Sequence, residues 1–189
     1  IIGVTSTYKS MPDFKVSADW RNPINEDANI SIGWSEAFDD TGSRVVHNIV
    51  VENCEIKGGV VHGIGIGVTE NVKILNNDIY NIRGTGIWGY YSNAINVVGN
   101  NVYNTGDDGI YIGANGYTKY APHSRNSDVV IKFNIIKNVS AKGIGLSGCN
   151  NAEISFNNIN STYNDGILLS HDNYSGHVSP KNVKVFNNI

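Results

Sequence analysis

The chain has 189 residues, enough for one domain with a sizeable core, and only 16% of them are charged, giving a net charge of -3. This composition excludes a disordered polyampholyte, and no basic patch appears that would bind nucleic acid. No apolar run approaches the roughly 20 residues of a membrane helix, and no signal segment opens the sequence. We therefore expect a folded protein that has no membrane span and no nucleic-acid partner.

Residues 1–28 are the least regular part of the chain, because Pro12 and Pro23 interrupt them and no repeat can be placed there. We interpret them as an irregular lead-in or an early repeat. Residues 29–189 are expected to form one repetitive domain. The sequence stops at Ile189 partway through a repeat and leaves an uncapped β end, so we expect a fragment of a longer chain.

Two columns of residues recur along this domain at fixed spacing. Gly-Ile-x-Ile segments begin at Gly63, Gly86, Gly109, Gly143 and Gly166. Nine residues before each glycine lie Cys54, Asn77, Asn100, Asn134 and Asn157, and Asn188 continues this column. The successive spacings of the second column are 23, 23, 34, 23 and 31 residues, so a 23-residue unit is repeated and two copies carry insertions of 11 and 8 residues. A fixed repeat of this length indicates a solenoid.

Each repeat contains three short predicted strands. In residues 71–79 and 151–159, apolar side chains recur two positions apart, which is the period of a strand with one buried face. The third strand is Gly-Ile-x-Ile, of which residues 29–33 are a degenerate first copy. The repeat is too short for a strand, a crossover helix and their turns. We therefore predict an all-β fold, a single-stranded right-handed parallel β-helix with about 23 residues and three short strands per turn.

The asparagine column has a structural explanation. A sharp bend between strands often requires left-handed dihedral angles, which Asn tolerates. Stacked carboxamides can also form hydrogen bonds between turns of the coil at the ~4.8 Å strand spacing. We expect this column to mark one bend of the coil and to carry no chemistry.

All three insertions, at residues 34–43, 114–126 and 171–180, follow a Gly-Ile-x-Ile strand or its degenerate copy. Loops that leave a solenoid at one corner build a wall along one face. The insertions supply candidate substrate-binding residues: Tyr117, Tyr120, His123 and Arg125 from the second, and His171 from the third. These side chains suit sugar stacking and carboxylate recognition, or they simply pin the loops onto the coil.

The candidate catalytic residues precede the repeated glycines. Read along the stack, this column contains His62, Thr85, Asp108, Lys142 and Asp165, with Asp107 beside Asp108. Asp108 and Asp165 are two turns apart, which places their backbones ~9.6 Å apart. Leaning side chains would then reach the roughly 6.5 to 9.5 Å separation of the acid and base in an inverting glycosidase. Repulsion from Asp107 would raise the pKa of one carboxyl group, as an acid requires.

Lys142 has three interpretations. It is the base of a polysaccharide lyase, with Asp107, Asp108 and Asp165 holding Ca²⁺, or it binds a substrate carboxylate in a hydrolase. Alternatively it neutralises the two flanking aspartates in a structural Asp-Lys-Asp ladder.

Outward-facing aromatic residues lie next to this column. By strand alternation, Trp88 and Tyr111 point away from the core on neighbouring turns of the coil. An exposed aromatic pair beside carboxylates forms a platform for a sugar ring, or else a simple aromatic ladder that covers the sheet. With His62, these two residues complete the substrate-binding set.

The repeated Asn-Val-x-Ile-x-x-Asn-x-Ile and Gly-Ile-x-Ile segments resemble the right-handed β-helix repeats of the pectin-lyase-like superfamily, which includes polysaccharide-degrading enzymes, phage tailspikes and adhesins. In its enzymes, the substrate cleft runs along the strand equivalent to Gly-Ile-x-Ile. Residues 106–112, with Asp107 and Asp108, resemble the Asp-Asp motif of polygalacturonase-like hydrolases, and His62-Gly63 is similar to their His-Gly motif. The order of the two motifs is reversed relative to that family.

The leading functional hypothesis is a depolymerase that hydrolyses a polysaccharide with paired aspartates and without a cofactor. The alternatives are a Ca²⁺-dependent lyase with Lys142 as base, and a non-catalytic shaft that binds glycans or bears load. A polysaccharide or cell-surface glycan is the expected partner, and the protein is expected to be extracellular or on a virion surface. A tailspike would also form a homotrimer.

Overall fold

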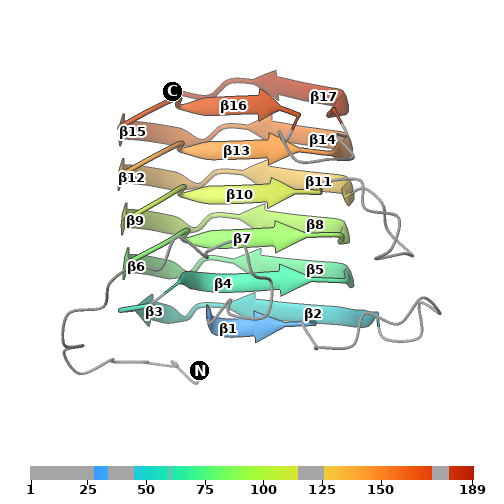
Figure 1. Cartoon of the computed structure of the whole chain (residues 1–189), viewed down its shortest axis with the longest axis horizontal. Coiled ribbons are helices and arrows are strands. Elements are labelled where there is room, and N and C mark those ends of the chain that lie inside the picture. The colour runs from blue at the N-terminus through green and yellow to red at the C-terminus, as the bar shows by residue number, and fades with distance from the viewer. Residues whose placement is uncertain (1–27, 34–44, 60, 115–125, 172–178) are drawn as a thin grey trace.

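The computed structural model describes residues 28–33, 45–59, 61–114, 126–171 and 179–189, and the regular structure in these ranges is all β-strand. Its 17 strands pair in parallel and form three sheets that extend along the whole stack (Figure 1). The predicted all-β parallel β-helix is therefore confirmed. None of the described ranges contains a helix that could cross a membrane.

Each turn of the coil adds one strand to every sheet. Sheet A contains β1 (Ala28–Ile32), β4 (His62–Gly67), β7 (Ile87–Tyr90), β10 (Ile110–Gly113), β13 (Ile144–Ser147) and β16 (Ile167–Ser170). Sheet B contains β2 (Val46–Glu52), β5 (Thr69–Leu75), β8 (Asn93–Val98), β11 (Asn126–Lys132), β14 (Cys149–Ser155) and β17 (Lys181–Phe186). Sheet C contains β3 (Glu55–Lys57), β6 (Asp78–Ile82), β9 (Asn101–Thr105), β12 (Ile135–Val139) and β15 (Asn158–Thr162). We call one turn of the coil a rung.

The core is a stack of isoleucine, valine and leucine side chains contributed by all three sheets. In sheet A, Ile64, Ile87, Ile110 and Ile144 are stacked in register and are fully buried. The register also pairs Ile30 with Ile64, which confirms that the repeat is already present in β1. Burial of each such side chain stabilises the fold by about 1.5 to 3 kcal/mol. Because alternate residues of each strand point outward, this core fixes which side chains lie on the outer face of sheet A.

The asparagine column forms a buried ladder at the bend between sheets B and C. The Oδ1 atom of Asn100 accepts hydrogen bonds from the backbone N of Asn77 at 3.0 Å and from its Nδ2 at 2.9 Å, and Asn100 Nδ2 donates to the carbonyl oxygen of Ile74 at 2.9 Å. The same bonds recur at Asn134 and Asn157. The predicted structural role is confirmed.

The predicted dihedral angles of this column were wrong. The left-handed residue is the one before each ladder asparagine, with φ values of 52° at Asn76, 70° at Gly99 and 55° at Phe133. The ladder asparagines are held at the bend by their buried hydrogen bonds and do not adopt a positive φ. At each bend, one residue therefore adopts the left-handed conformation and the asparagine after it forms the hydrogen bonds.

The insertions are all located at the corner between sheets A and B. In a rung without an insertion, a single residue separates β4 from β5, whereas residues 114–125 separate β10 from β11. The predicted corner is confirmed at β1, β10 and β16. Tyr117, Tyr120, His123 and Arg125, which were predicted to bind substrate from the second insertion, lie outside the described residues, as does the lead-in up to residue 27.

Candidate functional site

The predicted catalytic column lies along the edge of sheet A where each chain turn enters from sheet C. Backbone hydrogen bonds join its successive rungs: Gly86 N donates to the carbonyl oxygen of Asp108 at 3.0 Å, Gly109 N to that of Lys142 at 2.9 Å, and Gly143 N to that of Asp165 at 3.0 Å. Asp108, Lys142 and Asp165 therefore lie on three consecutive rungs, in the order that the repeat predicted.

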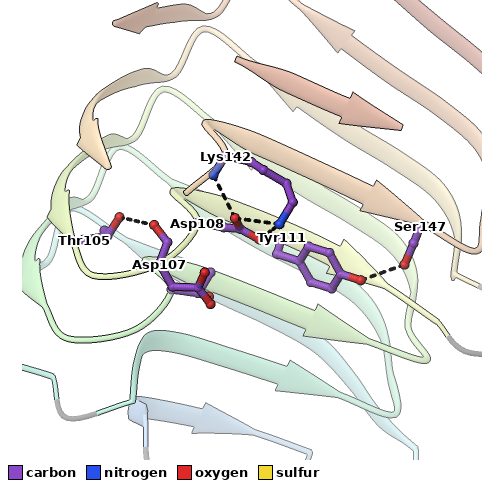
Figure 2. A network of polar contacts seen from close by, with 7 residues as sticks. Thr105, Asp107, Asp108, Tyr111, Lys142 and Ser147 are labelled. Carbon is purple, nitrogen blue, oxygen red and sulfur yellow. Dashed lines mark hydrogen bonds and ion pairs between the residues drawn. The ribbon is translucent and has the colours of Figure 1, made fainter. Parts of the chain in front are cut away.

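Asp108 and Lys142 form a close ion pair between adjacent rungs. Lys142 Nζ lies 3.1 Å from Oδ1 and 3.2 Å from Oδ2 of Asp108, and the backbone N of Lys142 donates to Oδ1 at 2.9 Å (Figure 2). The Asp108 side chain is only 5% exposed, while that of Lys142 is 25% exposed. The pair therefore presents the lysine to the outer face and keeps the carboxylate beneath it.

Burial changes the acidity of Asp108. Desolvation raises the pKa of this carboxyl group above its ordinary value, and the charge of Asp107 raises it further. The hydrogen bonds and positive charge of Lys142 act in the opposite direction without cancelling the rise. The sequence had suggested this role for Asp107, but desolvation is the larger cause.

Asp107 faces the rung below. Thr85 Oγ1 donates to Asp107 Oδ2 at 3.3 Å, and Thr105 Oγ1 donates to the backbone oxygen of Asp107 at 2.9 Å. The carboxylate itself is exposed and points away from the Asp108–Lys142 pair in Figure 2. The two adjacent aspartates therefore differ in environment: Asp108 is buried and paired, and Asp107 is solvated.

Asp165 is exposed and stands apart from the ion pair. Among the described residues it has no salt bridge, and Lys142 is directed to Asp108 alone. Of the predicted Asp-Lys-Asp ladder, only the contact between Asp108 and Lys142 is therefore present among the described residues.

Tyr111 lies flat on the outer face of sheet A beside the ion pair. Its hydroxyl forms a 2.8 Å hydrogen bond with Ser147 Oγ, and its ring centroid is 6.0 Å from Lys142 Nζ (Figure 2). A Cβ atom built at Gly145 would lie 2.7 Å from the ring, and one built at Gly113 would lie 2.5 Å from it. Glycine at these two positions is what allows the ring to lie down on the sheet.

Tyr111 belongs to a row of rings that we call the aromatic strip, composed of His62, Trp88, Tyr90 and Tyr111. The His62 and Trp88 rings are stacked with centroids 4.9 Å apart and planes 4° apart, and Trp88 and Tyr90 are stacked at 4.6 Å. Tyr90 and Tyr111 are tilted at 6.1 Å. The strip brings together three predicted binding residues, and it adds Tyr90, which sequence reasoning missed although it faces outward by the same alternation as Trp88.

His62 occupies the first rung of the strip. Its side chain is buried, with 8% exposure, and its Nδ1 atom has no hydrogen-bond partner in the part of the chain that the structure describes. Desolvation lowers its pKa to about 4, partly offset by a hydrogen bond with the backbone of Thr85. The imidazole is therefore neutral at physiological pH. His171, the described candidate of the third insertion, is exposed directly after β16.

A calcium site does not fit the described side chains. In the ranges that the structure covers, no group of three or more His, Cys, Asp or Glu residues is arranged to hold a metal ion. Asp108, which the lyase hypothesis would use as a ligand, is engaged with Lys142. We therefore derive no chemical step through a bound ion.

Comparison with known proteins agrees with this fold. Residues 38–188 match the family model described as a right-handed β-helix region. The chain belongs to this family. No curated protein and no solved structure matches the chain significantly.

Proposed function

We propose that the outer face of sheet A binds a carbohydrate polymer, with the aromatic strip as the stacking platform. The observation that carries this proposal is the placement of Tyr111, whose ring lies flat on the sheet beside the Asp108–Lys142 pair. An aromatic face stacks on the C–H groups of a sugar ring, and nearby charged groups bind its hydroxyls. The strip extends over the three consecutive rungs of β4, β7 and β10, so it can contact more than one unit of a polymer.

Binding to a glycan array, followed by affinity measurements on each polymer that binds, tests the proposal. Trp88→Ala and Tyr111→Ala should each weaken binding by about tenfold, the scale of a lost aromatic contact. Tyr103→Ala is the matched control, because Tyr103 is stacked in the same way on Tyr80 but lies on sheet C. Equal loss in all three variants, or no binding by the parent protein, would refute the proposal.

Hydrolysis is the second candidate function, and the raised pKa of Asp108 favours it. A general acid needs a pKa above that of an ordinary carboxyl group, and burial shifts the pKa of Asp108 in this direction; Asp165, two rungs along, is the candidate for the base. Asp108→Asn and Asp165→Asn should then each lower turnover of a bound glycan by about two to four orders of magnitude. Folding must be intact in both variants, as judged by melting temperature.

Elimination has less support than hydrolysis. The ammonium of Lys142 contacts both carboxylate oxygens of Asp108, so a lyase base would first have to leave this pair. Products that absorb in the ultraviolet as unsaturated uronates would nevertheless identify a lyase directly. An extracellular or virion-surface setting accords with a glycan-binding shaft, and a tailspike would act as a homotrimer.

A further inference from the structure

The charges along the outer face of sheet A restrict which glycan can bind there. We infer that the ligand is an uncharged polysaccharide and that polyuronates and sulfated glycans are rejected. This inference rests on the proposed glycan-binding function and specifies the ligand of the same surface.

The ammonium of Lys142, the cation of the column that precedes the glycines, is already neutralised by Asp108. Lys142 Nζ contacts both oxygens of Asp108, whose side chain is almost entirely buried. A ligand carboxylate could recruit this ammonium only by drawing it away from Asp108. That exchange would leave a desolvated carboxylate without its counter-charge, which is strongly unfavourable.

The remaining charges repel anions. Asp107 and Asp165 are both exposed, and neither forms an ion pair with another described residue. Asp107, Asp108 and Asp165 thus stand against the single ammonium of Lys142 in this column, a balance of 1 - 3 = -2. A polymer with a carboxylate on every sugar would place like charges along this edge.

His62 adds a ring to this face without adding charge. Its imidazole is at the end of the aromatic strip, stacked on Trp88, and burial keeps it neutral by lowering its pKa to about 4. The first rung of the strip therefore supplies an aromatic surface and no positive charge that would attract an anion.

The sequence of the three insertions does not reverse this balance. Their acidic residues are Glu36, Asp39, Asp40 and Asp172, and their basic residues are Lys119 and Arg125. Four negative and two positive charges give a net of -2. The insertions as a group therefore supply no excess of cations for an anionic polymer.

The test compares matched polymers that differ only in charge. Polygalacturonate, polymannuronate and their carboxyl-reduced forms are measured against the protein together with a panel of uncharged polysaccharides, at low and at moderate salt. We expect uncharged polymers to supply the ligands and carboxylated parents to bind at least about tenfold more weakly than any reduced form that binds. Added salt should reduce this difference, because it screens the repulsion.

Substitutions of Asp107 and Asp165 test whether their charges cause the selectivity against anionic polymers. Asp107→Asn combined with Asp165→Asn should admit polyuronates by removing the two unpaired charges, whereas Asp128→Asn, an exposed change on sheet B, should leave selectivity unchanged. Tighter binding of a carboxylated or sulfated polymer, or equal binding of both forms, would overturn the inference and leave the proposed function standing. Failure of every polymer to bind would instead overturn both.

Discussion

The carboxylate of Asp108 binds both the backbone and the side chain of Lys142: it accepts the amide N–H of Lys142 at 2.9 Å and contacts its ammonium at 3.1 and 3.2 Å. The pair links the rung of β10 to that of β13 at the edge of sheet A. Removing one partner of such a pair leaves the other in a changed environment, and the two removals are not equivalent. This asymmetry gives the first prediction.

Lys142→Ala should destabilise the fold more than Asp108→Asn. The alanine variant leaves a buried carboxylate with only a backbone N–H, for which we expect a loss of about 1 to 3 kcal/mol. The asparagine variant removes the buried charge, and its amide oxygen still accepts the N–H of Lys142, so about 1 kcal/mol or less should be lost. Denaturant melts at pH 7 measure both values. The reverse order would contradict the assigned geometry of the pair.

His62 should make the fold sensitive to acid. Its pKa is about 4 in the folded state against 6.5 ordinarily, so the unfolded chain takes up the proton first as the pH falls. Stability is therefore lost between about pH 6.5 and pH 4 and then levels off, by about 3 kcal/mol in total. His62→Phe, which retains a ring on Trp88 but cannot be protonated, should abolish this loss.

The control for the histidine prediction is His47→Phe. His47 lies at the surface with its side chain 50% exposed, so this variant makes the same histidine-to-phenylalanine replacement outside the core. Thermal melts of the parent and both variants from pH 7 to pH 4 make the comparison. An unchanged pH profile in His62→Phe would show that the imidazole is not buried in the folded state.

On acidification, Asp108 should have the opposite effect on the stability of the fold from His62. Because its folded pKa is raised, the folded state retains the proton more tightly than the unfolded state. Its contribution to stability is therefore fully present below the ordinary carboxyl pKa and is lost as the pH rises through the raised value. The stability of the parent protein relative to Asp108→Asn should accordingly increase on acidification. A difference that is constant with pH would mean that the pKa of Asp108 is not raised.

The sequence predicts the fold well because each repeat restates it. Ile110 is inside and Tyr111 outside for the same reason as in every other rung, so one correct alignment of the repeats assigns the whole core. The pairing within the candidate site is harder to predict. Spacing places Lys142 between Asp108 and Asp165, but only burial decides that it pairs with Asp108, and burial depends on which neighbouring side chains cover each carboxylate.

The backbone conformations at the bends are also hard to predict from the sequence. Phe133 and Phe156 adopt left-handed φ values of 55°, although phenylalanine gives no sign of it, because the hydrogen bonds of the next asparagine impose the bend. Their rings are stacked at 5.2 Å and remain 57% and 45% exposed. Repetition thus overrides local preference at these positions.

Ala94 should be a position where the fold can be stabilised. It has a φ of 51°, and it interrupts a surface column in which Asn71 and Asp128 occupy the neighbouring rungs with similar φ values. Asparagine tolerates this conformation and could bond to both neighbours, as Asn71 bonds to Asn48 at 2.7 Å. Ala94→Asn should therefore raise the free energy of unfolding by about 0.5 to 1 kcal/mol. Ala141→Asn, at a position without positive φ, is the control and should give no gain.

The buried asparagine ladder should contribute more to the free energy of unfolding than the neighbouring asparagines nearer the surface. Replacing Asn100 by alanine leaves the backbone N–H of Asn77 and the carbonyl oxygen of Ile74 without their partners inside the coil. Each orphaned group costs about 1 to 3 kcal/mol, so the total should approach the roughly 2 to 5 kcal/mol expected for Ile110→Ala. Asn101→Ala is the matched control, because the amide of Asn101 donates only to the exposed Asp78 and its loss should cost under about 1 kcal/mol. Denaturant melts of the three variants measure these differences. If Asn100→Ala and Asn101→Ala were equally stable, the ladder would not hold the bend between sheets B and C.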